Sequence, residues 1–155
     1  MRVRLRKIDY AVMGVCLAAA IGMLLYYLIN KNNLPTEVPM QYSFTGKIRA
    51  TGSRGNLLTF PLLLLFAVPG LAVVSMFPSM WNIPFAKVTE ENVGRVSACI
   101  RNMLDIMTIA MTAVFTTIFI CQARGTNAPA FILPLMLVIF LVDIIFWGIR
   151  TSKNA

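Results

Sequence analysis

The sequence predicts an all-α integral membrane protein: one domain spanning residues 1–155, with four transmembrane helices and an ordered extracytoplasmic loop between the first two. Hydrophobic residues make up 58% of the chain and charged residues only 13%, whereas soluble domains are about half apolar and about a quarter charged. Four apolar segments are long enough to cross about 30 Å of hydrocarbon. All 14 basic residues lie outside these segments, as expected for residues that flank membrane spans.

The first predicted helix covers residues 11–29, which include no charged residue. A basic start before an apolar run also describes a signal peptide, but this run is longer than the usual apolar region and ends without a small-x-small cleavage site. We therefore expect a retained helix. Tyr26 and Tyr27 at its far end suit a membrane interface.

The second predicted helix covers residues 57–77. Pro61 falls in its first turns, where a missing amide hydrogen costs little. Pro69 and Gly70 fall in its middle and predict a kink. A helix broken at a binding site, as in transporters, is the alternative for this pair.

The third and fourth predicted helices cover residues 103–121 and 130–147. They follow a cytoplasmic loop, residues 78–102, in which Thr89 and the acids after it resemble a helix start. We expect a helix to begin near Thr89 and to continue into the third span. The short turn that starts at Gly125 predicts a tight antiparallel pair of helices.

Four helices put both chain ends on one side of the membrane, and the basic residues indicate which side that is. Nine flank the terminal side and five the other, so the positive-inside rule places both termini in the cytoplasm. The nine are Arg2, Arg4, Arg6, Lys7, Lys87, Arg95, Arg101, Arg150 and Lys153, and the five are Lys31, Lys47, Arg49, Arg54 and Arg124.

The outward loop, residues 31–56, contains an alternation of apolar and polar residues from Val38 to Phe44, followed by a turn signal at Gly46. This pattern predicts a short strand or hairpin whose apolar side rests on the helices or the membrane interface. Ser53 or Asn56 can cap the second helix. Two interpretations stay open: a tight cap over the helices, or recognition of an external peptide, lipid or protein.

Three charged residues are predicted to lie within the membrane or at the cytoplasmic start of the third span, where charges are costly and often functional. Arg101 and Asp105 lie four residues apart on one helix face, and Asp143 is expected at a similar depth. We expect Arg101 to pair with Asp105, Asp143 or both. An interhelical clasp is the first interpretation, and a proton or cation relay or a lipid-headgroup site are the alternatives.

Composition argues against most catalytic classes. The chain has no His, and its three Cys are isolated in or beside apolar stretches, so we expect no metal and no cofactor. No pairing of a nucleophile with a base and no phosphate-binding loop is visible, so we expect no enzyme. The net charge of +8 is assigned to anionic lipid headgroups rather than to nucleic acid.

Two stretches carry a resemblance to a known family. LPTEVPMQYSFTGKIRATGSRG, residues 34–55, resembles the N-terminal domain of the Sdp-type toxin immunity proteins, a bacterial membrane domain of unknown function. WNIPFAKVTEENVGRV, residues 81–96, is similar to a later run of the same domain. The matching residues are Leu34, Pro35, Val38, Pro39, Tyr42, Gly46, Gly52, Ser53 and Arg54 in the first stretch, and Asn82, Pro84, Thr89, Glu90, Glu91 and Asn92 in the second.

The resemblance covers about two thirds of the chain, residues 11–101, with two departures: Gln41 stands where the family usually has His, and Ser43 where it has Asn. It implies a multi-pass protein of the bacterial cytoplasmic membrane that confers resistance to an external peptide or signals its presence. The residues carried over as a ligand or partner site are Pro35, Pro39, Gln41, Tyr42, Gly46, Gly52, Ser53 and Arg54.

The leading functional prediction is thus a non-enzymatic immunity, sensing or accessory protein that recognises an extracytoplasmic peptide or partner. The alternative is a small ion-coupled transporter that uses Asp105 and Asp143. The expected partners are the lipid bilayer, the external peptide or protein, and a second copy of the chain; nucleic acid is not expected.

Overall fold

The computed structural model describes residues 3–81 and 88–154. Asn82 and Pro84 of the second family-like stretch lie outside the described residues, as do Arg2 and Lys87. The described chain forms four long helices, a two-stranded hairpin and two short 3-10 turns. In order, these are α1 (Lys7–Asn30), β1 (Glu37–Tyr42), β2 (Ile48–Ser53), η1 (Arg54–Leu58), α2 (Thr59–Met76), η2 (Pro78–Met80), α3 (Val93–Arg124) and α4 (Ile132–Asn154).

The four long helices match the four predicted spans: α1, α3 and α4 are longer than the apolar segments that predicted them, and α2 is longer when η1 is counted with it. Taken with η1, α2 provides 23 residues, and α1, α3 and α4 provide 24, 32 and 23. At about 1.5 Å per residue, each exceeds the roughly 30 Å of a hydrocarbon core. The prediction of four helices long and apolar enough to cross a membrane is confirmed.

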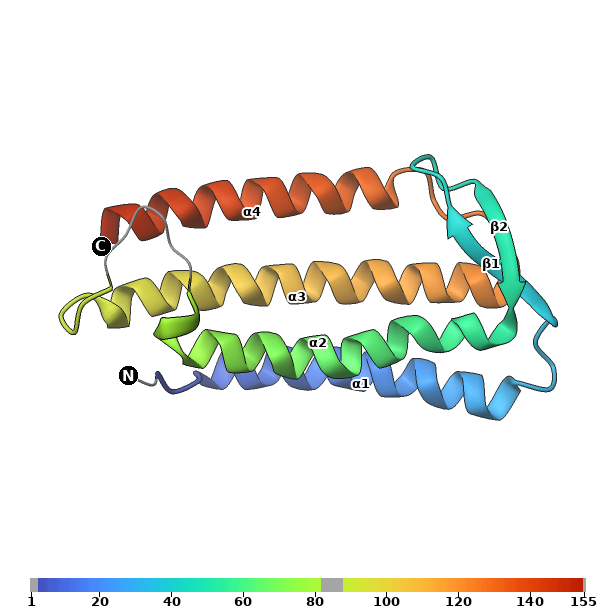
Figure 1. Ribbon diagram of the computed structural model, residues 1–155, viewed down its shortest axis with the longest axis horizontal. Helices are drawn as coiled ribbons and strands as arrows, with labels where there is room; N and C mark the ends of the chain where they lie inside the picture. Colours follow the sequence, from blue (N-terminus) through green and yellow to red (C-terminus); the bar gives the residue numbers. More distant parts are fainter. Residues whose placement is uncertain (1–2, 82–87, 155) are drawn as a thin grey trace.

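Helix α3 is the central element of the fold. It packs against α1 and α2 on one side and against α4 on the other (Figure 1). The chain ends lie together at one end of the bundle, and the hairpin lies at the opposite end (Figure 1). Both agree with the predicted arrangement of four spans and one large loop. The buried core between α1, α2 and α3 is apolar, and includes Cys16, Ala20, Met23, Leu64, Val68 and Phe119.

The loop between α1 and α2 forms the hairpin that its alternating pattern predicted. Strands β1 and β2 pair antiparallel from Glu37 opposite Ser53 to Tyr42 opposite Ile48, with an irregularity around Gln41. Val38 is fully buried and joins the core of the helix bundle. The buried part of the hairpin therefore rests on the helices as expected, but Met40 and Phe44 of the same alternation are exposed, so the expectation holds only in part.

One predicted helix start is displaced, although that helix continues into the third span as expected, and one predicted cap is wrong. The helix expected near Thr89 begins at Val93, because the Asn92 side chain accepts a hydrogen bond from the Thr89 amide at 2.8 Å and folds these residues into a turn. Neither Ser53 nor Asn56 caps the second helix by a side-chain hydrogen bond. The 3-10 turn η1 runs directly into α2. The first residues of α2 therefore continue an existing turn and do not need a side-chain cap.

Helix α2 is continuous through Pro69 and Gly70, which excludes the broken-helix alternative for this segment. The connection from α3 to α4, residues 125–131 and called the connector below, begins with Gly125 in the left-handed conformation at φ 66°. Its amide bonds back to the carbonyl groups of Cys121 and Gln122, which ends α3. This turn confirms the predicted tight pairing of the last two helices.

Candidate functional site

The N-terminal segment, residues 3–6, crosses the end of the bundle where the chain termini lie. The amide of Val3 donates to the carbonyl of Met76, the last residue of α2, at 2.9 Å. The guanidinium of Arg101 on α3 donates to the carbonyl of Arg4. The segment thus ties together the ends of α1, α2 and α3.

Arg6 is the centre of the charged groups at this end. Its guanidinium lies 2.6 Å from Asp9 and 3.3 Å from Asp105, and it donates to the side-chain oxygen of Asn102 at 2.7 Å. The backbone amide of Arg6 also donates to Asp9 at 2.7 Å, so Asp9 closes the first turn of α1. An acid there also meets the positive end of the helix dipole.

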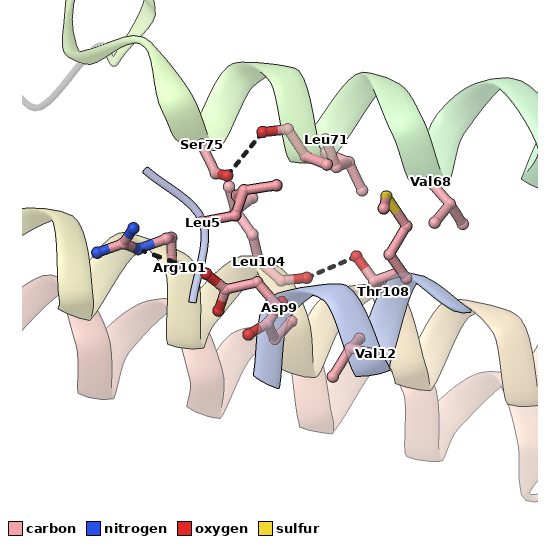
Figure 2. Close-up of a pocket in the computed structure, with 12 residues that line it drawn as sticks. Leu5, Asp9, Val12, Val68, Leu71, Ser75, Arg101, Leu104 and Thr108 are labelled. Atoms are coloured by element: carbon pink, nitrogen blue, oxygen red, sulfur yellow. Dashed lines mark hydrogen bonds and ion pairs between the residues drawn. The ribbon is translucent and has the colours of Figure 1, made fainter. Parts of the chain in front are cut away.

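Arg101 pairs with Asp9 rather than with the acids predicted from sequence. Its Nε lies 3.8 Å from Asp9 Oδ2, and Figure 2 shows the guanidinium of Arg101 beside the Asp9 side chain. The expected pairing with Asp105 or Asp143 is wrong. Spacing along α3 puts Arg101 and Asp105 on one face, but the long arginine side chain extends to the N-terminal segment, while Asp105 meets Arg6.

The ionic cluster therefore consists of Arg6, Asp9, Arg101 and Asp105. A cavity of about 20 Å³ lies beside the ionic cluster (Figure 2), and Ser75 of α2 is among the other residues that line it. The cavity is large enough for about one water molecule. Toward the hairpin the cavity gives way to the apolar core. The opposite charges of the cluster meet as ion pairs that link the N-terminal segment, α1 and α3.

Asp143 lies away from the ionic cluster. It sits at the midpoint of α4, eleven residues from each end of the helix. Helix α4 lies on the opposite side of α3 from α1 and α2 (Figure 1), so Asp143 cannot approach Arg6 or Asp9. Its residue is 5% exposed, and neither carboxyl oxygen has a hydrogen-bond partner among the residues described.

The tip of the hairpin is bonded to the connector at the other end of the bundle. The Tyr42 hydroxyl donates to the carbonyl of Thr126 at 3.2 Å, and the Ile48 amide donates to the Asn127 side chain at 3.1 Å. The Ala128 amide donates to the carbonyl of Gly46 at 2.9 Å. Burial raises the pKa of the Tyr42 phenol to about 12, so this donor stays protonated at neutral pH.

Gly46 is required at the tip for two reasons. Its φ of 78° is in the left-handed region, and a Cβ there would lie 2.1 Å from the carbonyl oxygen of Ala128. Both Tyr42 and Gly46 hold the hairpin on the connector. Their contacts therefore favour the interpretation of the loop as a tight cap over the helices.

The remaining predicted loop residues divide into buried and exposed positions. Pro39 is buried, Gly52 is partly buried, and Pro35, Gln41 and Ser53 are exposed. Arg54, the last of the site residues carried over from the resemblance, donates to the carbonyl of Lys31 at 2.6 Å and closes the base of the loop.

An exposed face of the hairpin was not singled out by the sequence. The apolar residues Met40, Phe44 and Ile48 are exposed, with Phe44 the most exposed of the three. Lys47 and Arg49 are exposed on the same hairpin. We call these five exposed residues, which come from both sides of the hairpin, the hairpin face. Met40 and Phe44 belong to the apolar half of the alternating pattern, so the sequence did not signal their exposure.

Arg6, Asp9 and Asn102 are site residues that the sequence interpretation missed. The spacing of three between Arg6 and Asp9 was a usable signal, because it favours a local ion pair at a helix start. The chain matches no family model, no curated protein and no solved structure. The resemblance to the immunity-protein domain stays a prediction.

Proposed function

We propose that this chain is a non-enzymatic protein of the bacterial cytoplasmic membrane that recognises an extracytoplasmic peptide or protein, as an immunity, sensing or accessory protein. The observation that carries the proposal is the hairpin face, held on the helix bundle by the contacts of Tyr42 and Gly46. A binding loop fixed on a rigid scaffold loses little conformational entropy when a ligand binds.

The chemistry of the hairpin face indicates what it would bind. Phe44 and Met40 supply apolar contact area, and Lys47 and Arg49 supply positive charge. A peptide with apolar side chains and an acidic group complements this combination. The topology with both termini in the cytoplasm, which follows from the distribution of basic residues, puts the hairpin face outside the cell.

The test is protection of living cells. A bacterial host that expresses or lacks the chain is challenged with secreted peptides and membrane-active toxins, and killing and membrane depolarisation are recorded. We expect Phe44→Ser and Arg49→Glu to abolish a protection that the wild type gives. Ile29→Ser, which changes a still more exposed apolar residue on α1, is the matched control and should keep protection.

Membrane insertion of every variant is checked by fractionation, so that loss of protein is separated from loss of recognition. Protection that survives both hairpin-face substitutions in the inserted protein would refute the proposal. Tyr42→Ala and Gly46→Val are less informative here, because both disrupt the seat of the hairpin.

An ion-coupled transporter is the second candidate, and the unpaired Asp143 favours it. On this hypothesis Asp143→Asn stops a pH- or ion-dependent flux in proteoliposomes, while Asp105→Asn tests the other acid. Flux that survives Asp143→Asn would remove this residue from the path. Between the ionic cluster and the hairpin, the core of the α1–α2–α3 bundle is apolar and offers an ion no polar path. Transport through this bundle is therefore the weaker hypothesis.

A further inference from the structure

Asp143 is an acid in an unusual setting. At about 1.5 Å per residue, its position at the midpoint of α4 lies about 16 Å from either end of the helix. Both carboxyl oxygens are buried without a hydrogen-bond partner among the described residues. The indole N–H of Trp147, one turn away on the same helix, is a polar neighbour of the carboxyl, but at a geometry outside that of a standard hydrogen bond.

No nearby basic residue forms an ion pair with the Asp143 carboxyl among the described residues. On α3, the element against which α4 mainly packs, Arg101 and Asp105 are engaged with Asp9 and Arg6. On α4 itself, Arg150 lies over the ring of Trp147 at 5.7 Å and makes no ion pair with Asp143 in the described structure. An unpaired carboxylate in apolar surroundings is far more costly than the neutral acid.

We propose that Asp143 is a proton-binding site, occupied while α4 is packed on α3 and able to exchange its proton only when α4 moves away. The ligand is the proton itself, because the covered oxygens leave no room for a larger cation. The site is distinct from the ionic cluster, in which Asp9 and Asp105 lie 2.6 Å and 3.3 Å from the Arg6 guanidinium.

An apolar groove leads from the outside of the helix pair to this site. It has a volume of about 430 Å³ and is lined by Ile106 of α3 and by Val138, Val142, Phe146 and Trp147 of α4, beside Asp143 itself. A lipid-soluble reagent can enter the groove from the bilayer. It reaches the carboxyl oxygens only when the two helices separate, because those oxygens are covered.

The hairpin is placed to limit this separation. Helix α4 packs mainly on α3, and its start is held through the three hydrogen bonds between the hairpin and the connector. At the other end, the Asn154 amide contacts the Cys99 sulfur at 3.7 Å. Loosening the hairpin should therefore let α4 move and expose Asp143. If the proposed function holds, a ligand on the hairpin face would change proton exchange at this site.

Reaction with dicyclohexylcarbodiimide tests the proposal in the full chain reconstituted in lipid nanodiscs. The carboxyl proton passes to a carbodiimide nitrogen as the carboxyl oxygen bonds to the central carbon, and the adduct rearranges to an N-acylurea without loss of an atom. Peptide mass spectrometry locates the adduct. We expect modification of Asp143 at mildly acidic pH, falling as the pH rises, with Asp9 and Asp105 modified several-fold less.

Two single-atom variants test the role of the hairpin. Tyr42→Phe removes only the hydroxyl that bonds to Thr126, and should raise the rate at Asp143 several-fold. Tyr10→Phe is the matched control, since Tyr10 is exposed on α1, and should leave the rate unchanged. Asp143→Asn should abolish the adduct.

Chain unfolded in detergent, in which every acid is accessible, shows that the reagent is active. Equal modification of all three acids, or none at Asp143 at any pH, would overturn the proton site. An unchanged rate in Tyr42→Phe would overturn the control by the hairpin. The assay needs no external peptide and no flux, so its outcome is separate from that of the proposed function.

Discussion

Replacing Gly46 with alanine tests the seat of the hairpin on the connector. An L residue at φ 78° costs about 1–2 kcal/mol relative to glycine. The new Cβ would also lie 2.1 Å from the carbonyl oxygen of Ala128, so the hairpin tip or the connector must shift. Losing the hydrogen bond between Ala128 and Gly46 adds about 1 kcal/mol. The expected loss in unfolding free energy is therefore about 2–3 kcal/mol.

Gly125→Ala is the matched control for this experiment. Gly125 also has a positive φ, of 66°, but nothing lies within 4 Å of its Cβ position. Its substitution should cost only the strain of about 1–2 kcal/mol. Gly22→Ala in α1, with open space and helical backbone, should cost nothing.

The unfolding free energy of the three variants is measured by denaturing-detergent titration in mixed micelles, followed by circular dichroism. Gly46→Ala should be the least stable by about 1 kcal/mol relative to Gly125→Ala. Equal losses in these two variants would refute the close approach of the hairpin to Ala128.

Three further predictions concern other contacts. Arg6→Gln leaves the carboxylates of Asp9 and Asp105 without their shared cation, and should lower the unfolding free energy by about 2 kcal/mol. The loss is smaller than for a fully buried pair because Arg6 is partly exposed. An equal loss in Lys7→Gln, which changes an exposed residue, would contradict this prediction. Because the folded-state pKa of Tyr42 is raised to about 12, its contribution to stability is complete below the ordinary pKa of about 10 and is lost as pH rises through about 12. In an alkaline titration followed by tyrosinate absorbance, the step at the highest pH should disappear in Tyr42→Phe. An unchanged titration curve would refute the raised pKa of Tyr42. Leu57→Ala, at a fully buried position in η1, should lower the unfolding free energy by about 2–5 kcal/mol and so lower the melting temperature. An unaltered melting curve would show that this position is not packed.

The sequence was sufficient for the helices and for the hairpin. Four apolar runs of spanning length predicted four long helices because a backbone in hydrocarbon must satisfy its own hydrogen bonds. The alternation from Val38 to Phe44 predicted the hairpin, since successive side chains of a strand point to opposite faces. Gly125 predicted the turn because few other residues tolerate a left-handed conformation.

Tertiary structure decided which charges meet. From sequence, the spacing of Arg101 and Asp105 on one helix face made them natural partners, and the depth of Asp143 made it a third. Only the packing of α1 against α3 brings Asp9 and Arg6 to Arg101 and Asp105, and only the position of α4 behind α3 leaves Asp143 alone. The pairing of charges depends on which helices are neighbours, and a linear pattern of residues does not contain that information.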